Sequence, residues 1–200
     1  MDTYWNRTGV FAAVVAVLTA CSKDKPGTGD TGLETAASEP ASQSGAARPP
    51  VPGMSDANIF YSLDRAHLID SAAGAVAVTK GTNSEVRDYA RLMMRDHHDL
   101  RQRGLELAKR VAITPEPPPN DASQARMDRT MSVLNGAAKG RDFDHAYIDN
   151  EVETHKTVLE TLTAAMGAAQ NADLQNMIQK AAPTILSHFD MAQSIQRKLK

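Results

Sequence analysis

The sequence predicts an all-α protein: an antiparallel four-helix bundle with a short extra helix in the connection between the second and third long helices. Aromatic residues make up only 4% of the chain, which disfavours a β-sandwich or a β-barrel. Apolar residues recur at alternating three- and four-residue steps in four long segments, as they do on the buried face of a helix. Short turns join these segments in pairs, so the two helices of a pair are predicted to run antiparallel.

The first helix is predicted to follow Ser55 and Asp56, which are favourable N-cap residues, and to end at Lys80 before a turn over residues 81–83. Its inner face is apolar or small apart from one carboxylate, Asp70. The residues predicted on this face are Ile59, Leu63, Ala66, Asp70, Ala73 and Ala77.

The second helix is predicted over residues 84–113, because the proline run over residues 115–119 cannot continue it. Its inner face is apolar or small except for His97 at the centre. The residues of this face are Val86, Ala90, Met93, His97, Leu100, Gly104, Leu107 and Val111. A titratable group in the middle of a buried face is either a tolerated polar core residue or the reason that the face exists.

The connection after the second helix is predicted to contain the short extra helix. Asp121 or Ser123 is its predicted cap, and its apolar residues are Met127, Met131 and Leu134.

The second pair of long helices is predicted to begin near Asp142, to break over residues 167–171 and to end at Leu199. Each helix places one histidine on its inner face. The predicted faces are Ile148, Val152, His155, Leu159, Leu162 and Met166 in the third long helix, and Leu174, Ile178, Ala181, Ile185, His188, Ala192, Ile195 and Leu199 in the fourth.

The four inner faces each contain one ionisable residue, and these are Asp70, His97, His155 and His188. Asp70 lies 12 residues before Thr82 and His97 lies 15 residues after it. A rise of about 1.5 Å per residue therefore puts the two within about 5 Å of the same height. His155 and His188 lie 16 and 17 residues from the turn of the second pair, so they are level as well. The sequence predicts one ionisable layer near the middle of the bundle.

Imidazole nitrogens together with a carboxylate are the ligand set of Zn²⁺, Fe²⁺, Mn²⁺ or Cu²⁺ sites, so this layer is a candidate site for one transition-metal ion. The candidate ligands are His97, His155, His188, Asp70 and Glu151. Glu151 and Asp96 are alternatively predicted to be acceptors that fix the tautomer of a histidine. His67, one turn before Asp70, is a weaker candidate.

A metal-free interpretation stays open beside this one. The layer can instead be a buried His–Asp network that sets the register of the helices in a structural or interaction module of the cell envelope. The sequence identifies no protein partner for such a module. An enzyme is the least favoured interpretation, because the sequence shows no Ser-His-Asp arrangement and no catalytic residue is assigned.

The first twenty residues are predicted to be a lipoprotein signal peptide. The apolar run from Gly9 to Ala20 would span about 18 Å as a helix, which is short of the ~30 Å hydrocarbon core of a membrane. It leads directly into Cys21, the one cysteine of the chain, in a Leu-Thr-Ala-Cys sequence that resembles the lipobox of bacterial lipoproteins. This resemblance implies lipidation at Cys21. With Ser22 next, it also implies an outer-membrane lipoprotein that faces the periplasm.

Residues 21–53 are predicted to form a disordered tether, because they are rich in Gly, Ser, Thr, Ala and Pro and show no apolar period. The folded bundle is predicted over residues 54–200. The net charge of −2 offers no domain-wide basic surface, which argues against a nucleic-acid partner. The lipid anchor makes the membrane the expected partner.

Four stretches of the chain resemble the bacterial domain-of-unknown-function 4142 family over about residues 55–198. They are Ile69-Asp70 with Gly74 and Ala77, the run from Glu85 to His97, Phe143 to Tyr147 with His155, and Ala182 to Ile185 with His188, Met191 and Ala192. The Asp-His that ends the second run is the most specific of these motifs.

The resemblance implies a secreted or lipid-anchored protein with a ferritin-like bundle and with His97, His155 and His188 at family positions. Asp70 stands where the family usually has Glu. The chain also lacks the paired Glu-x-x-His motif of di-iron ferritin-like proteins, so a mononuclear site or none fits better than ferroxidase chemistry. The expected function is that of a non-catalytic, lipid-anchored envelope bundle that binds one transition metal.

Overall fold

The computed structural model describes residues 54–200, and the predicted signal peptide, Cys21 and tether lie outside the described residues. This part of the chain contains five helices and no strand, which confirms the predicted all-α helical bundle. The helices are α1 (Asp56–Lys80), α2 (Ser84–Arg110), α3 (Ser123–Gly136), α4 (Arg141–Ala168) and α5 (Ala172–Leu199). None of the described helices has an apolar stretch long enough to cross a bilayer.

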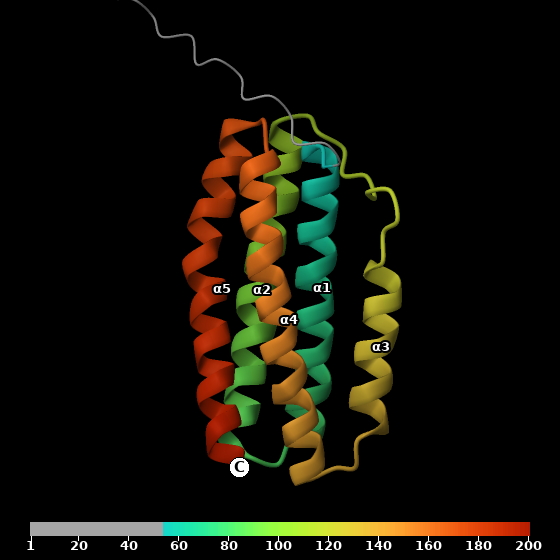
Figure 1. Ribbon diagram of the computed structural model, residues 1–200, viewed down its shortest axis with the longest axis vertical. Coiled ribbons are helices and arrows are strands. Elements are labelled where there is room, and N and C mark those ends of the chain that lie inside the picture. The colour runs from blue at the N-terminus through green and yellow to red at the C-terminus, as the bar shows by residue number, and fades with distance from the viewer. Residues whose placement is uncertain (1–53) are drawn as a thin grey trace, which may run out of the picture. The chain divides into compact units, whose positions relative to one another are not determined.

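The four long helices form two hairpins that pack face to face. Within the hairpins α1 contacts α2 and α4 contacts α5, and between them α2 contacts α5 and α1 contacts α4. Helix α3 lies outside this ring of four and packs against α1 and α4 (Figure 1). Every long helix therefore turns one face toward a shared interior.

The helix ends follow local sequence chemistry. Ser55 caps α1 in a reciprocal capping box with Asn58. Helix α2 is capped by Asn83, whose side chain accepts hydrogen bonds from the backbone N–H groups of the next turn. The predicted end of α2 at Ile113 was three residues too late. The helix ends at Arg110, because the chain leaves the helical conformation and Ala112 takes a φ of +55°.

The inner face of α4 differs from the predicted one. Val152, Leu159 and Met166 are only half-buried, whereas Glu151 and Val158 are buried. The predicted face followed the apolar residues and passed over the carboxylate. The observed buried face of α4 comprises Phe143, Asp144, Tyr147, Ile148, Glu151, His155, Val158, Leu162, Ala165 and Ala168.

One carboxylate from each hairpin binds the turn of the other hairpin. Asp144, at the start of α4, accepts hydrogen bonds from the backbone N–H groups of Thr82 and Asn83, both at 2.9 Å, and from the Thr82 hydroxyl at 2.7 Å. Asp56, at the start of α1, accepts hydrogen bonds from two backbone N–H groups of the α4–α5 turn, each at 2.9 Å. These contacts set the axial register of the two hairpins, and the register decides which residues meet in the middle.

Helices α1 and α2 approach each other closely at Gly74. A Cβ atom at this position would lie 2.9 Å from the Ala90 carbonyl oxygen and 3.0 Å from Met94 Cγ. We expect Gly74→Ala to destabilise the bundle by about 1–3 kcal/mol, because a backbone carbonyl cannot move aside. Gly104→Ala in α2 is the matched control, since a Cβ there meets nothing within 4 Å. It should stabilise the protein by up to about 1 kcal/mol through helix propensity. Urea unfolding curves that show a gain in stability for both variants would contradict this.

Candidate metal centre

Three buried histidines from three different helices meet in the middle of the bundle. His97 of α2, His155 of α4 and His188 of α5 are 0%, 0% and 1% exposed. The ring centroids lie 5.3 to 5.6 Å apart. One ring nitrogen from each histidine lies within 4.8 Å of the corresponding nitrogens of the other two. The structure thus brings together the three histidines that the sequence places at one height.

Each imidazole has one ring nitrogen held by a neighbouring group. His155 Nδ1 donates to the backbone carbonyl oxygen of Glu151 at 3.0 Å, within its own helix. His188 Nε2 lies 3.0 Å from Asp96 Oδ2, across the α2–α5 contact. His97 Nδ1 lies 3.0 Å from His67 Nδ1 and 3.3 Å from Asp70 Oδ2. Such contacts fix both the tautomer and the ring orientation of a histidine.

The opposite ring nitrogens have no hydrogen-bond partner within the described residues. These are His97 Nε2, His155 Nε2 and His188 Nδ1, and all three are buried. In His155 and His188 the held nitrogen faces an oxygen acceptor and carries the proton, so the other nitrogen presents a lone pair. These two lone pairs and the unpaired Nε2 of neutral His97, in a confined space, can form the donor set of a transition-metal site with an open fourth position.

Burial keeps these imidazoles neutral. Removal from water, with a smaller contribution from the nearby His188, lowers the pKa of His155 to about 4 against the opposing effect of its hydrogen bond to the Glu151 backbone. Burial and then the neighbouring histidines lower the pKa of His97 well below its ordinary value. The same causes, together with Arg101, lower the pKa of His67 to about 4. Burial also lowers the pKa of His188, although Asp96 opposes this. Neutral imidazole is the form that binds a metal.

Two predicted ligands, Asp70 and Glu151, lie behind the histidines. Asp70 Oδ2 is 3.3 Å from His97 Nδ1, and Glu151 Oε2 is 3.5 Å from His155 Nδ1, so both face the held nitrogens. Neither belongs to the group of converging ligand atoms. Burial raises the pKa of Asp70 to about 7, and burial followed by the Asp70 charge raises that of Glu151. Their four carboxyl oxygens have no hydrogen-bond partner within the described residues.

These pKa shifts predict the pH dependence of the metal-free protein. The unfolded histidines take up protons below pH 6.5 and the folded ones do not, so their stabilisation is present above pH 6.5 and lost toward pH 4. For His67 and His155 this loss is on the order of 3 kcal/mol each. The two buried carboxyls act in the opposite direction, since their stabilisation is present at low pH and lost as the pH rises through about 7 for Asp70.

The loss of stability from the four histidines is larger than the gain from the two carboxyls. The urea concentration at the unfolding midpoint of the metal-free protein should therefore decrease as the pH is lowered from 6.5 to 4.5. His155→Leu should show a smaller fall, because one fewer imidazole is protonated on unfolding. A wild-type midpoint that stays constant or rises toward pH 4.5 would refute this assignment.

Sequence reasoning missed two tyrosines beside the centre. The Tyr89 and Tyr147 hydroxyls are buried and have no hydrogen-bond partner within the described residues, and the rings lie edge to face at 6.2 Å. Burial, and then the Glu151 charge, raises the pKa values of both tyrosines. The signal was present in the spacing, because Tyr89 lies two helical turns before His97 and Tyr147 lies two before His155.

The protein-family model described as "Domain of unknown function (DUF4142)" matches residues 39–195. No curated protein matches the chain. The solved structure "CopM in the Cu(II)-bound form" is similar with a TM-score of 0.56 and 12% sequence identity, over 72% of this chain and 98% of that one. At this identity the likeness concerns the fold.

Proposed function

The chain belongs to the DUF4142 family, and we propose that it binds one transition-metal ion through His97, His155 and His188. The observation that carries this proposal is the set of three buried ring nitrogens that have no protein partner while the opposite nitrogens are held. A bound cation would satisfy all three lone pairs at once.

A network that served only to set helix register would be built differently. Buried polar groups in native proteins are nearly always paired, because each unpaired group costs about 1–3 kcal/mol. The His188–Asp96 contact already links α5 to α2, whereas the His155–Glu151 contact lies within α4. Three further unpaired nitrogens add nothing to register. They do supply the ligands of a metal site.

The residues behind the histidines have a defined part in this proposal. Asp96 and the Glu151 carbonyl hold two imidazoles in the orientation that exposes the free nitrogen, and acceptors in this position raise the basicity of the ligand. His67 Nδ1 is the hydrogen-bond partner of His97 Nδ1, and Asp70 Oδ2 lies 3.3 Å from the same nitrogen. Imidazole nitrogens suit Zn²⁺, Cu²⁺ and Fe²⁺. The similar structure of CopM holds Cu(II), which makes copper the first metal to test.

Titration of untagged, chelator-treated protein tests the proposal. Cu²⁺ and Zn²⁺ are added against a competing chromophoric chelator, and one tight equivalent per chain is expected. His145→Ala is a suitable control, because His145 lies at the start of α4 and outside the cluster. Failure of every tested metal to bind stoichiometrically would refute the proposal.

The first part of the sequence supports a proposal about the location of the protein. We propose that Cys21 carries the lipid, that residues 22–53 tether the bundle, and that this ferritin-like domain faces the periplasm at the outer membrane. The lipobox-like sequence supports this. Cys21→Ser should move the protein from the membrane fraction to the soluble periplasmic fraction and abolish labelling with radioactive palmitate. An unchanged distribution would contradict the anchor.

A further inference from the structure

We infer that His67 is the residue through which a metal ion reaches the three histidines, and that the Arg101–Asp64 ion pair closes this route. The inference rests on the proposed function and adds how the site is filled. It also assigns a role to His67, which is not among the three converging ligands.

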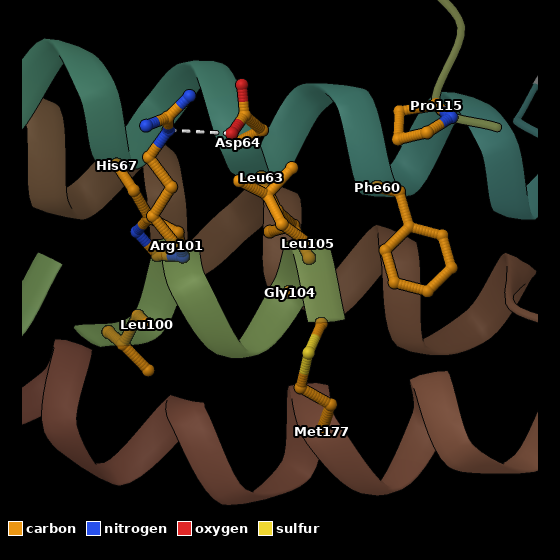
Figure 2. Close-up of a pocket in the computed structure, with 10 residues that line it drawn as sticks. All are labelled: Phe60, Leu63, Asp64, His67, Leu100, Arg101, Gly104, Leu105, Pro115 and Met177. Carbon is orange, nitrogen blue, oxygen red and sulfur yellow. Dashed lines mark hydrogen bonds and ion pairs between the residues drawn. The ribbon is translucent and has the colours of Figure 1, made fainter. Parts of the chain in front are cut away.

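The three histidines cannot take up an ion directly from solvent, because they are 0%, 0% and 1% exposed. His67 joins them to the surface. Its Nδ1 lies 3.0 Å from His97 Nδ1, and its remaining 7% of exposed surface lines a pocket between α1 and α2. Figure 2 shows His67 at one side of this pocket and Met177 of α5 across from it. The ring of His67 therefore contacts both the pocket and the centre.

The size of the pocket suits one small ion that has shed most of its water. Its interior volume of about 10 Å³ leaves room for about one water molecule. The walls are mainly apolar, from Phe60, Leu63 and Leu100, and Gly104 adds no side chain to them. A Cβ at Gly104 would meet nothing within 4 Å, so this side of the pocket is open. The imidazole of His67 is the neutral nitrogen donor that an ion would meet there.

An ion pair spans the same pocket. Arg101 Nε lies 2.7 Å from Asp64 Oδ1, and Figure 2 shows the Arg101 side chain beside His67. The guanidinium is close enough to His67 to help lower its pKa. A fixed positive charge at this position repels an approaching cation. Asp64 lies one turn before His67 on the same face of α1, so movement of Arg101 would leave a carboxylate and an imidazole side by side.

These contacts define a loading order. An ion would displace Arg101 from Asp64 and bind Asp64 and His67. It would then pass beside the His97 ring, whose Nδ1 contacts His67, to the unpaired Nε2 on the other side of that ring. Both side chains of the ion pair are partly exposed, at 31% and 20%, so the pair can open without disturbing the core.

Stopped-flow loading of the full-length, metal-free protein with Cu²⁺ tests this order. His67→Phe should load copper at least about tenfold more slowly. Because it also removes the hydrogen-bond partner of His97 Nδ1, its affinity should fall by about 10- to 100-fold as well. Arg101→Gln should load severalfold faster. Arg103→Gln is the matched control, since Arg103 also lies on α2 but does not line this pocket. If His67→Phe fails to fold, His67→Gln takes its place.

Unchanged loading rates in both His67→Phe and Arg101→Gln would overturn the inference. A loss of affinity in His67→Phe at an unchanged loading rate would overturn it as well, because His67 would then only position His97. In either case one equivalent bound by the wild-type protein leaves the proposed function standing. Absence of copper uptake by the wild-type protein would refute both.

Discussion

Replacement of His97 by alanine is expected to lower the affinity for the first metal equivalent by well over about 100-fold, since loss of an outer hydrogen-bond partner alone costs 10- to 100-fold. His97 supplies one of only three converging nitrogens, and no other residue of the described chain joins this group. The adjacent residue, His98, is exposed and lies outside the group, so His98→Ala should bind metal like the wild type. Competition titration against a chelator of known affinity measures both variants.

The His97→Ala variant also distinguishes a metal site from a metal-free histidine network. A ligand that binds only the folded state raises its stability by about 2.7 kcal/mol at 100 times its dissociation constant. Wild-type protein should therefore show a higher unfolding temperature with metal, and His97→Ala should show no such shift. If metal raised the unfolding temperatures of both proteins equally, the ion would be bound elsewhere.

Replacement of Asp144 by alanine is expected to destabilise the protein by about 2–4 kcal/mol, because a buried carboxylate and its three hydrogen bonds are lost. Thr82 and Asn83 would lose the acceptor that holds the α1–α2 turn against α4. Asp142→Ala is the control, since Asp142 occupies the same first turn of α4 but is exposed. It should change the stability by less than about 1 kcal/mol.

Urea unfolding monitored by circular dichroism gives both values. Asp144→Ala that is still folded should retain one metal equivalent, because Asp144 does not belong to the histidine group. Equal stabilities of the Asp144 and Asp142 variants would show that this carboxylate does not hold the hairpins in register.

The bundle and the common height of the histidines could be predicted because both depend on simple periodicities. The short turns limit the relative sliding of paired helices, and a constant rise per residue then places His97, His155 and His188 in one layer. Asp56 and Asp144 add a second constraint on register that the sequence does not reveal, since they contact turns 114 and 62 residues away.

The rotation of each helix and the choice of rotamer could not be predicted in this way. The inner face of α4 includes Glu151, a buried carboxyl that the apolar periodicity alone does not place there. Asp70 and Glu151 face the held nitrogens rather than the free ones, and that difference depends on side-chain torsions. The contact between His67 and His97 likewise depends on how α1 is rotated against α2.

X-ray absorption spectroscopy of protein loaded with one equivalent of Cu²⁺ or Zn²⁺ tests the central claim most directly. The expected spectrum shows nitrogen or oxygen neighbours at about 2.0–2.1 Å with the multiple scattering of three imidazoles. His188→Ala should reduce this to two imidazoles, provided that metal is still retained. A first shell with one imidazole or none in the wild-type protein would contradict the assignment of His97, His155 and His188 as the metal site.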